Sequence, residues 1–401
     1  MKKQSLSLRT YLTLVRPQAA QGDAPSPPRA PRPDGPLVWS HAETAQQARA
    51  MGSLCARLLQ QRAELSVLTT GARGQAELHD DLPPDSPAEV AAFLTHWSPT
   101  LCLWAGQNLR PALLSGAADQ QCPLALVGAS DQPWHTPAPR WLPDVAPAVL
   151  QRFDMIFTED AAAEWRLSRM GVPRSILRRS GPLSEATLPL DCPRRLHEEM
   201  AEALAGRPVW LAARVRRSEV DCILRAHRSA ARLAHRLLLI LVPADPQDAD
   251  DIARAASATG FRICDWDADG QPDEHTQILV TQGPDELGLW YRLAPLSFIG
   301  GSLAAGLGGH DPLEASALGS AVLYGPHVGG HLTSYTRLIE AGAARIVRDE
   351  ETLSAAVSQL IAPDRAAAMA HAGWDVVSAG AEMTDRVVEQ ALDWLDRAGA
   401  A

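Results

Sequence analysis

The feature that most constrains the fold of this chain is the segment 298–326, FIGGSLAAGLGGHDPLEASALGSAVLYGP. Two short apolar runs typical of strands, Leu296–Ile299 and Ala321–Tyr324, frame it. Between them lie two glycine clusters and an apolar pattern that predicts a helix beginning near Pro312 and ending at Gly319. The order strand, glycine loop, helix, strand is typical of one βαβ unit in a parallel sheet.

The polar groups of this segment gather where its strands end. In open parallel sheets that edge binds ligands, because helix N-termini and backbone amides converge there. The residues that we expect to bind a nucleotide sugar are Gly300, Gly301, Ser302, Gly309, His310 and Glu314. In this hypothesis backbone amides and Ser302 bind phosphate, and Glu314 binds the ribose hydroxyls. The alternative is that the glycines only make tight turns.

The longer run Glu286–Pro326, ELGLWYRLAPLSFIGGSLAAGLGGHDPLEASALGSAVLYGP, resembles the nucleotide-sugar half of the 3-deoxy-D-manno-octulosonic acid (Kdo) transferases. The resemblance continues more weakly from about Gly35 to Asp349. It implies an α/β fold of the GT-B glycosyltransferase-like type, with two Rossmann-like domains facing a cleft. It also implies transfer of Kdo from the donor CMP-Kdo, or a related CMP-sugar, to a lipid A precursor in lipopolysaccharide core biosynthesis.

The same resemblance places two more residues on the donor side. Glu286 begins the matching run, and Arg214 follows a predicted strand at the family's A-S-T-H position. Arg214, with Arg216 and Arg217, is able to bind phosphate or carboxylate. The alternative is a solvated basic turn. A CMP leaving group needs no metal if such groups stabilise the phosphate charge, so we expect neither a metal nor a cofactor.

Length and composition agree with a two-domain globular protein. A chain of 401 residues exceeds one ordinary hydrophobic core, and 46% of its residues are apolar without any run of transmembrane length. The net charge of −10 argues against nucleic acid as a partner. The six cysteines lack metal-ligand spacing, and no secretory signal is visible, so we expect a cytoplasmic protein.

Alternating strand and helix patterns predict four divisions of the chain. Residues 1–36 form a tail and proline-rich linker, and 37–190 an acceptor-side Rossmann-like domain. Residues 191–383 form the nucleotide-sugar domain, and the helix in 384–401 is expected to cross back to the first domain. Within the tail, the leucines and basic residues of the first 17 residues are typical of a short amphipathic helix on the inner membrane surface. A poorly ordered tail is the alternative.

The residue that would take the acceptor proton is altered. Trp39–Gln47, WSHAETAQQ, resembles the family's W-x-H-A-x-S-V-G-E, whose terminal glutamate is the implied general base. Gln47 occupies that position, and an amide accepts no proton at neutral pH. Glu43, one helical turn earlier, is the replacement candidate, and Gln47→Glu is expected to restore or raise activity. Alternatively, Glu43 only complements the helix dipole.

The acceptor side departs from the family at a second loop. The family's E-x-E-L-W-P-N becomes GQNLRPA at residues 106–112, so two carboxylates are lost and Arg110 replaces a tryptophan. Two function classes follow from these departures. The first is an active Kdo transferase, and the alternative is a catalytically degenerate paralogue that binds a nucleotide or a partner without transfer.

Overall fold

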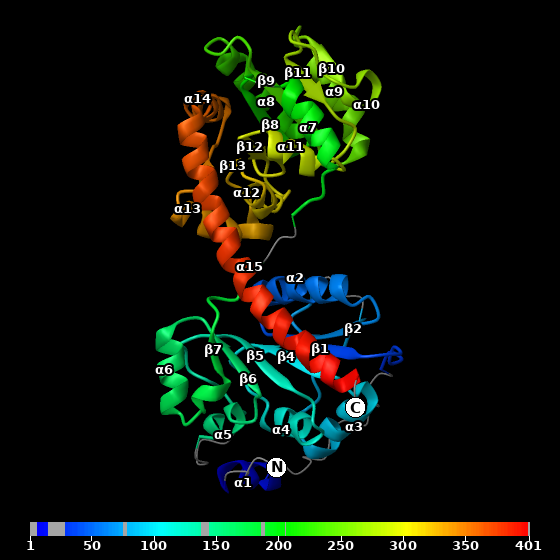
Figure 1. Cartoon of the computed structure of the whole chain (residues 1–401), viewed down its shortest axis with the longest axis vertical. Coiled ribbons are helices and arrows are strands. Elements are labelled where there is room, and N and C mark those ends of the chain that lie inside the picture. The colour runs from blue at the N-terminus through cyan, green and yellow to red at the C-terminus, as the bar shows by residue number, and fades with distance from the viewer. Residues whose placement is uncertain are drawn as a thin grey trace. The chain divides into compact units, whose positions relative to one another are not determined.

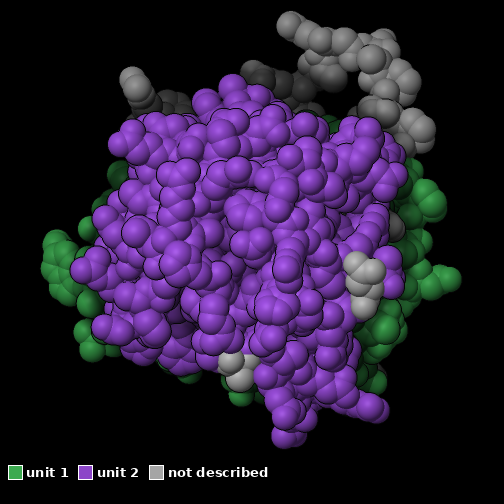
Figure 2. Space-filling view, turned by 90° about the horizontal axis from the view of Figure 1, so that it is seen from above, with its two compact units in different colours: residues 1–186, 379–401 green, residues 187–378 purple. Residues whose placement is uncertain are grey.

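The computed structural model describes residues 6–14, 29–74, 78–137, 144–185, 189–204 and 206–399. The chain divides into two compact units, which are coloured separately in Figure 2. Unit 1 comprises residues 1–186 and 379–401, and unit 2 comprises residues 187–378. The border falls within the proline-rich segment 181–195.

Unit 1 contains a seven-stranded parallel sheet in the order β3-β2-β1-β4-β5-β6-β7 (Figure 1). Its strands are β1 (Leu37–Ala42), β2 (Ser66–Gly71), β3 (Leu78–His79), β4 (Leu101–Ala105), β5 (Leu124–Ala129), β6 (Met155–Thr158) and β7 (Leu177–Arg179). The chain builds outward from β1 to β3 and then in the opposite direction from β4 to β7. The order therefore reverses between β1 and β4, the position at which such sheets bind ligands.

Helices cover both faces of this sheet (Figure 1). They are α1 (Leu6–Leu14), α2 (Ala45–Gln61), α3 (Pro87–Trp97), α4 (Pro111–Asp119), α5 (Ala146–Leu150), α6 (Ala161–Arg169), the 3₁₀ turn η1 (Arg174–Ile176) and the end of α15 (Pro363–Gly399). One apolar cluster joins α1, α3, α4 and α5 to one face, and another joins α2 and the end of α15 to the other. Burial on both faces explains why the central strands β4 and β5 are almost entirely apolar.

The N-terminal helix packs on unit 1 with its apolar side. In α1 the side chains of Leu8 and Tyr11 are fully buried in the core, whereas Leu6 and Leu14 are exposed. The predicted membrane-facing surface is therefore partly wrong, because Leu8 packs against protein. The basic residues Lys2, Lys3 and Arg16, together with Val15, lie outside the described residues. Within the described part of the chain, no helix has the length and hydrophobicity to cross a membrane.

Unit 2 contains a second seven-stranded parallel sheet, in the order β10-β11-β9-β8-β12-β13-β14 (Figure 1). Its strands are β8 (Val209–Val215), β9 (Leu238–Pro243), β10 (Ile263–Asp265), β11 (Ile278–Val280), β12 (Leu296–Ile299), β13 (Ala321–Tyr324) and β14 (Ala344–Ile346). The order reverses between β8 and β12. β12 and β13 have the bounds that the sequence predicts.

The helices of unit 2 again lie on both faces of the sheet. They are α7 (Arg194–Ala203), α8 (Arg217–Ala231), η2 (Pro246–Asp248), α9 (Ala249–Ser257), α10 (Trp266–Asp269), α11 (Leu287–Leu293), α12 (Leu313–Ala317), η3 (Gly329–His331), α13 (Leu332–Glu340), α14 (Glu350–Leu360) and the first part of α15, up to residue 378. Clusters around α8, α9 and α14 and around α7, α11 and α13 fill the two cores. Two Rossmann-like parallel sheets confirm the predicted GT-B-like α/β class.

Candidate functional site

In unit 2 the predicted residues meet where the sheet order reverses. We call this group the β8–β12 edge; its members are Arg214, Gly300, Gly301, Ser302, His310 and Glu314. Arg214 lies near the end of β8, and the glycine loop follows β12 directly. A Cβ atom on Gly300 would lie 2.4 Å from the carbonyl oxygen of Arg214. Only glycine allows the two strand ends to approach so closely.

The backbone amides of the glycine loop are bound by a side chain that the sequence analysis missed. Glu219, in the first turn of α8, is 1% exposed. Its Oε1 accepts hydrogen bonds from the amides of Ser302 (2.9 Å) and Leu303 (2.8 Å), and its Oε2 accepts from those of Gly301 (2.7 Å) and Arg216 (3.2 Å). An internal carboxylate therefore occupies the anion-binding turn that we predicted for phosphate.

Ser302 is likewise committed to the fold. The residue is fully buried, and its hydroxyl donates to the carbonyl oxygen of Ile299 and accepts from the amide of Gly325 at 2.8 Å. The amide of Gly309 donates to the carbonyl oxygen of Gly301 at 2.8 Å. The prediction that these amides and this hydroxyl bind phosphate must therefore be corrected, because each already has an internal partner.

The two charged side chains of the β8–β12 edge, Arg214 and Glu314, form an ion pair. The guanidinium of Arg214 binds the carboxylate of Glu314 in a bidentate manner, with Nη2 at 3.0 Å and 3.1 Å from the two oxygens and Nε at 3.3 Å. The two side chains are 23% and 15% exposed. Burial raises the pKa of Glu314, and the charge of Arg214 opposes that shift. The pair is positioned with Arg214 at φ +52°, a left-handed conformation that is uncommon outside glycine.

An uncharged imidazole borders this pair. Burial above all, together with the charges of Arg214 and Arg216, lowers the pKa of His310 to about 4, so the ring is neutral at pH 7. The Tyr335 hydroxyl donates to the His310 carbonyl oxygen at 2.9 Å, which fixes the loop. Neutral His310 can donate one hydrogen bond and accept another, as recognition of a sugar or phosphate oxygen requires.

The remaining donor-side candidates lie elsewhere. Glu286 precedes α11, and burial raises its pKa while the indole of Trp266 opposes that shift by hydrogen bonding; this contact belongs to the β10–β11 end of the sheet. Arg216 pairs with Asp248 at 3.5 Å, and Arg217 with Asp221 at 3.3 Å. Of the three arginines, only Arg214 joins the β8–β12 edge.

In unit 1 the residues at the reversal form a second group, the β1–β4 edge, which comprises Glu43, Gly106, Asn108 and Arg110. A carboxylate oxygen of Glu43 accepts a hydrogen bond from the backbone amide of Asn108. Gly106 has φ +149°, and a Cβ atom there would lie 2.4 Å from Oε1 of Glu43. Glu43 thus fills the space that a side chain at position 106 would need. Its carboxylate lies against the loop 106–110, in which the family's two glutamates are absent.

Gln47 has a structural partner in this group. Its Oε1 accepts hydrogen bonds from the backbone amides of Glu43 and Thr44, both at 3.1 Å. The hydroxyl of Thr44 accepts a hydrogen bond from the backbone amide of Gln47 at 3.2 Å, which completes a capping box at the start of α2. The side chain at the implied base position is therefore directed to its own helix terminus.

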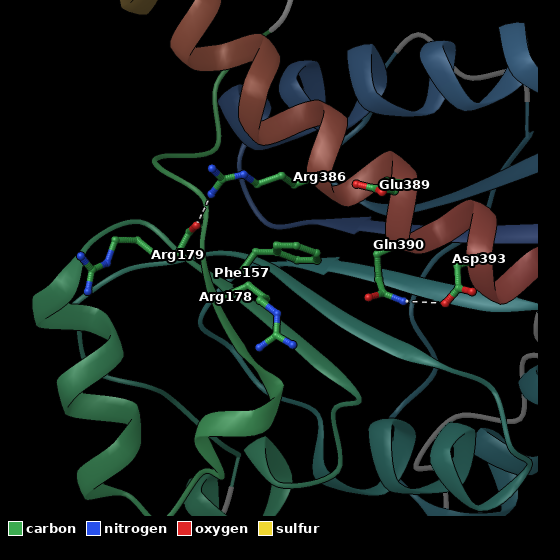
Figure 3. Close-up of a pocket in the computed structure, with 7 residues that line it drawn as sticks. All are labelled: Phe157, Arg178, Arg179, Arg386, Glu389, Gln390 and Asp393. Atoms are coloured by element: carbon green, nitrogen blue, oxygen red, sulfur yellow. Dashed lines mark hydrogen bonds between the residues drawn. The ribbon is translucent and has the colours of Figure 1, made fainter.

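A cavity of about 470 Å³ lies in unit 1 between β6, β7 and the end of α15 (Figure 3). Phe157, Arg178, Arg179, Arg386, Glu389, Gln390 and Asp393 line it. Arg386 donates to the carbonyl oxygen of Arg179, and the guanidinium of Arg179 pairs with Glu164 at 2.8 Å. None of the predicted site residues lines this cavity. Among the described residues, no group of three or more His, Cys, Asp or Glu side chains could hold a metal ion.

Comparison with known proteins points to one family. A family model described as 3-deoxy-D-manno-octulosonic-acid transferase (kdotransferase) matches residues 16–183. The chain is 31% identical over 392 residues to the 3-deoxy-D-manno-octulosonic acid transferase of Bordetella pertussis, covering 92% of this chain and 89% of the relative. It is 24% identical over 396 residues to the transferase of the same name from Haemophilus influenzae, covering 94% and 90% of the two chains.

Part of the chain is also similar to a solved structure. The C-terminal CMP-Kdo binding domain of WaaA from Acinetobacter baumannii covers 46% of this chain and 96% of its own length. The identity is 23% and the TM-score 0.44.

Proposed function

The chain belongs to the 3-deoxy-D-manno-octulosonic acid transferase family, and from this premise we propose that it transfers Kdo from CMP-Kdo to a lipid A precursor. The single observation that carries the proposal is the β8–β12 edge, where a buried Arg214–Glu314 ion pair and neutral His310 meet at the reversal of a Rossmann-like sheet. A nucleotide sugar offers phosphate, carboxylate and hydroxyl groups that match these side chains.

The donor would bind by replacing the hydrogen bonds between Arg214 and Glu314 with hydrogen bonds from each side chain to the donor. Glu314 accepts hydrogen bonds, so its partners are the ribose hydroxyls. Arg214 then has guanidinium N–H groups for the phosphate of CMP or the carboxylate of Kdo, which it binds with bidentate geometry. The glycine loop, fixed by Glu219, holds these side chains in position rather than binding the phosphate through its own amides.

The acceptor would lose its proton to the β1–β4 edge. In the proposed step, Glu43 takes the proton of the acceptor hydroxyl, and the resulting oxygen attacks the anomeric carbon of Kdo. The bond between that carbon and the CMP phosphate oxygen breaks, and CMP leaves with the electron pair. The positive charge of Arg214 stabilises the negative charge on the departing phosphate.

The site of action follows from the acceptor. Because the acceptor is a lipid, we place the reaction at the cytoplasmic face of the cytoplasmic membrane. The protein would reach it as a peripheral partner.

Calorimetric titration with CMP and a transfer assay with CMP-Kdo and lipid A precursor test the proposal together. Wild type should bind CMP and transfer Kdo. Glu314→Ala should weaken CMP binding by about 1–3 kcal/mol, because a charged acceptor for the hydrogen bonds of the ribose hydroxyls is lost. The matched control is Glu340→Ala, which removes an exposed carboxylate at the end of α13. Folded wild-type protein that binds no CMP would exclude the donor site.

The same experiment separates the proposed function from its alternative. CMP binding without transfer would identify a degenerate paralogue. The position of Glu43 on the Asn108 amide favours the active enzyme, since it provides a carboxylate that Gln47 cannot.

A further inference from the structure

The cavity of about 470 Å³ in unit 1 carries charged groups that the proposed transfer reaction does not use (Figure 3). It lies beside β7, the last strand of the unit 1 sheet, and beside the end of α15. Four of its lining residues, at positions 386, 389, 390 and 393, have the spacing that places side chains on one face of a helix. A cavity of this volume is large enough to bind a small molecule.

The wall formed by β7 offers two parallel hydrogen-bond donors. Arg178 is the register partner of Phe157 in β6, so the two side chains project to the same face of the sheet. Nη1 of Arg178 donates to the carbonyl oxygens of Ser175 (3.1 Å) and Leu177 (2.9 Å), which holds the guanidinium in place. Within the described part of the chain, its Nε and Nη2 have no acceptor. These two groups form the planar fork that binds a phosphate or carboxylate with two hydrogen bonds.

The wall formed by α15 offers a carboxylate. Glu389 lines the cavity and is exposed, and it has no ion pair or hydrogen bond with any other described residue. Asp393, one turn further along α15, pairs instead with Arg397 at 2.7 Å. The carboxylate of Glu389 is therefore available to a cationic ligand group.

The two remaining arginines of the cavity already have carboxylate partners. Arg386 donates to Glu382 and to the carbonyl oxygen of Arg179. The guanidinium of Arg179 pairs with Glu164 of α6 at 2.8 Å. The cavity thus presents one cation on β7 and one anion on α15 that lack a charged partner among the residues that the structure describes.

From this arrangement we propose that the cavity binds a phosphoethanolamine group, in which a short apolar chain joins an oxyanion to a primary ammonium. The phosphate accepts the two hydrogen bonds of the Arg178 fork, and the ammonium donates to the Glu389 carboxylate. The two methylene groups pack on the ring of Phe157, which lines the cavity and is 3% exposed. An α-amino acid fits less well, because its two charges are attached to one carbon atom, whereas the fork and the carboxylate lie on separate elements.

The inference does not depend on Kdo transfer, and calorimetric titration of the full chain tests it. The ligands are O-phosphoethanolamine, ethyl phosphate, which lacks the ammonium, and ethanolamine, which lacks the phosphate. Wild type should bind O-phosphoethanolamine about tenfold or more tightly than either fragment, because each fragment loses one charged hydrogen bond. Arg178→Gln should abolish the advantage over ethanolamine, and Glu389→Gln the advantage over ethyl phosphate. The control, Arg174→Gln, removes an exposed arginine of η1 outside the cavity and should leave all three affinities unchanged.

Hydrogen exchange locates the ligand and identifies its source. Bound O-phosphoethanolamine should slow exchange of the amides of residues 386–393, because it joins this part of α15 to β7, and Arg178→Gln should remove the effect. Vesicles of phosphatidylethanolamine are compared with vesicles of phosphatidylcholine, whose trimethylammonium group donates no hydrogen bond. Slower exchange with phosphatidylethanolamine alone among the vesicles supports a lipid headgroup as the ligand. Slower exchange with the free compound and with neither vesicle supports a soluble ligand.

Three results would overturn the proposal. The first is folded wild type that binds no O-phosphoethanolamine. The second is equal affinity for ethyl phosphate and O-phosphoethanolamine, since the cavity would then bind an anion without regard to the ammonium. The third is binding that both Arg178→Gln and Glu389→Gln retain in full, which would place the ligand elsewhere on the chain.

Discussion

The β8–β12 edge and the β1–β4 edge share one topology but differ in how their charged groups are bonded. In unit 2, the Glu219 carboxylate binds four backbone amides while 1% exposed, and Arg214 and Glu314 form a largely buried bidentate pair. In unit 1, the Glu43 carboxylate accepts a hydrogen bond from one amide, and Arg110 donates to the carbonyl oxygen of Pro83 and lies 4.0 Å from the Asp85 carboxylate. The charged groups of the β8–β12 edge thus bind one another or backbone amides, whereas the β1–β4 edge has fewer internal hydrogen bonds.

This difference explains where the sequence resembles its family closely and where it does not. A carboxylate that satisfies several buried amides cannot change without a large energetic cost. A partly exposed loop such as 106–110 can exchange its charges more freely, because solvent satisfies what the side chains release. In unit 1 the two carboxylates of the family's loop are absent, and Gly106, at the position of one of them, makes room for Glu43.

The first prediction concerns the β1–β4 edge, and its expected effect is the largest. Glu43→Gln should lower kcat by about 10²–10⁴, because general-base catalysis contributes that range. CMP affinity should not change, since Glu43 lies in unit 1. Steady-state transfer kinetics and calorimetry measure the two quantities.

A second variant separates chemistry from structure at this position. Gly106→Ala keeps the carboxylate but places a Cβ atom within 2.4 Å of it, so Glu43 must move and kcat should also fall. If Glu43→Gln retains full turnover, Glu43 is excluded as the base.

The next prediction concerns the glycine loop at the β8–β12 edge. Glu219→Ala should destabilise unit 2 by about 2–4 kcal/mol, because it leaves the buried amides of Gly301, Ser302 and Leu303 without an acceptor. Hydrogen exchange of these amides should become faster, and thermal unfolding should shift to lower temperature. The control, Glu202→Gln on the exposed side of α7, should change neither. Unchanged exchange in Glu219→Ala would mean that the loop does not depend on this carboxylate.

A smaller effect concerns two neutral histidines, the buried His41 of β1 and His310 of the β8–β12 edge. The pKa of His41 is lowered to about 3 and that of His310 to about 4, so the unfolded chain binds more protons than the folded protein below about pH 6.5. Stability therefore falls as the pH decreases, by about 1.4 kcal/mol per pH unit for each histidine once the unfolded form is protonated. The loss ends near pH 4 for His310 and continues to about pH 3 for His41.

Histidine titration by NMR checks this directly. Both rings should remain neutral at pH 5 in the folded protein and should titrate near pH 6.5 after unfolding in urea. If either ring is protonated at pH 5 while the fold is intact, the burial argument is wrong for that histidine.

The sequence predicted the architecture well, for physical reasons. Both faces of these parallel sheets are covered, so the central strands are short apolar runs; β12 and β13 have the predicted bounds. The sequence also indicated which loops carry polar residues, because the carboxyl ends of parallel strands lie at one edge.

The hydrogen-bond partner of each polar group could not be predicted from the sequence. Glycines and a serine after a strand are equally consistent with a phosphate ligand and with an internal carboxylate 83 residues away, as between Glu219 and Ser302. The only local signal for Glu219 was its place in the first turn of a helix that follows a strand. Long-range pairing of this kind depends on tertiary structure. The same holds for Glu43, whose proximity to Gly106 links two separate strand ends.

The smallest effect is expected for Gln47→Glu, which tests whether a carboxylate at the family's general-base position can act as the base in this protein. Gln47→Glu returns a carboxylate to the family position, which on sequence grounds should restore or raise activity. In the structure, however, Oε1 of Gln47 accepts from the amides of Glu43 and Thr44, and a glutamate would accept from the same amides at least as well, because its charge complements the helix N-terminus. We therefore expect stability to rise by no more than about 0.5 kcal/mol and kcat to change by less than a few-fold.

Combining the two substitutions makes the argument decisive. If Glu43 is the base, Gln47→Glu in the Glu43→Gln background should remain as inactive as Glu43→Gln alone, because the new carboxylate is bound to the helix terminus. If the double variant regains turnover, position 47 can reach the acceptor after all. The two edges would then differ even more than their hydrogen bonds indicate, since capping at the β1–β4 edge would have to open during catalysis while Glu219 at the β8–β12 edge stays fixed.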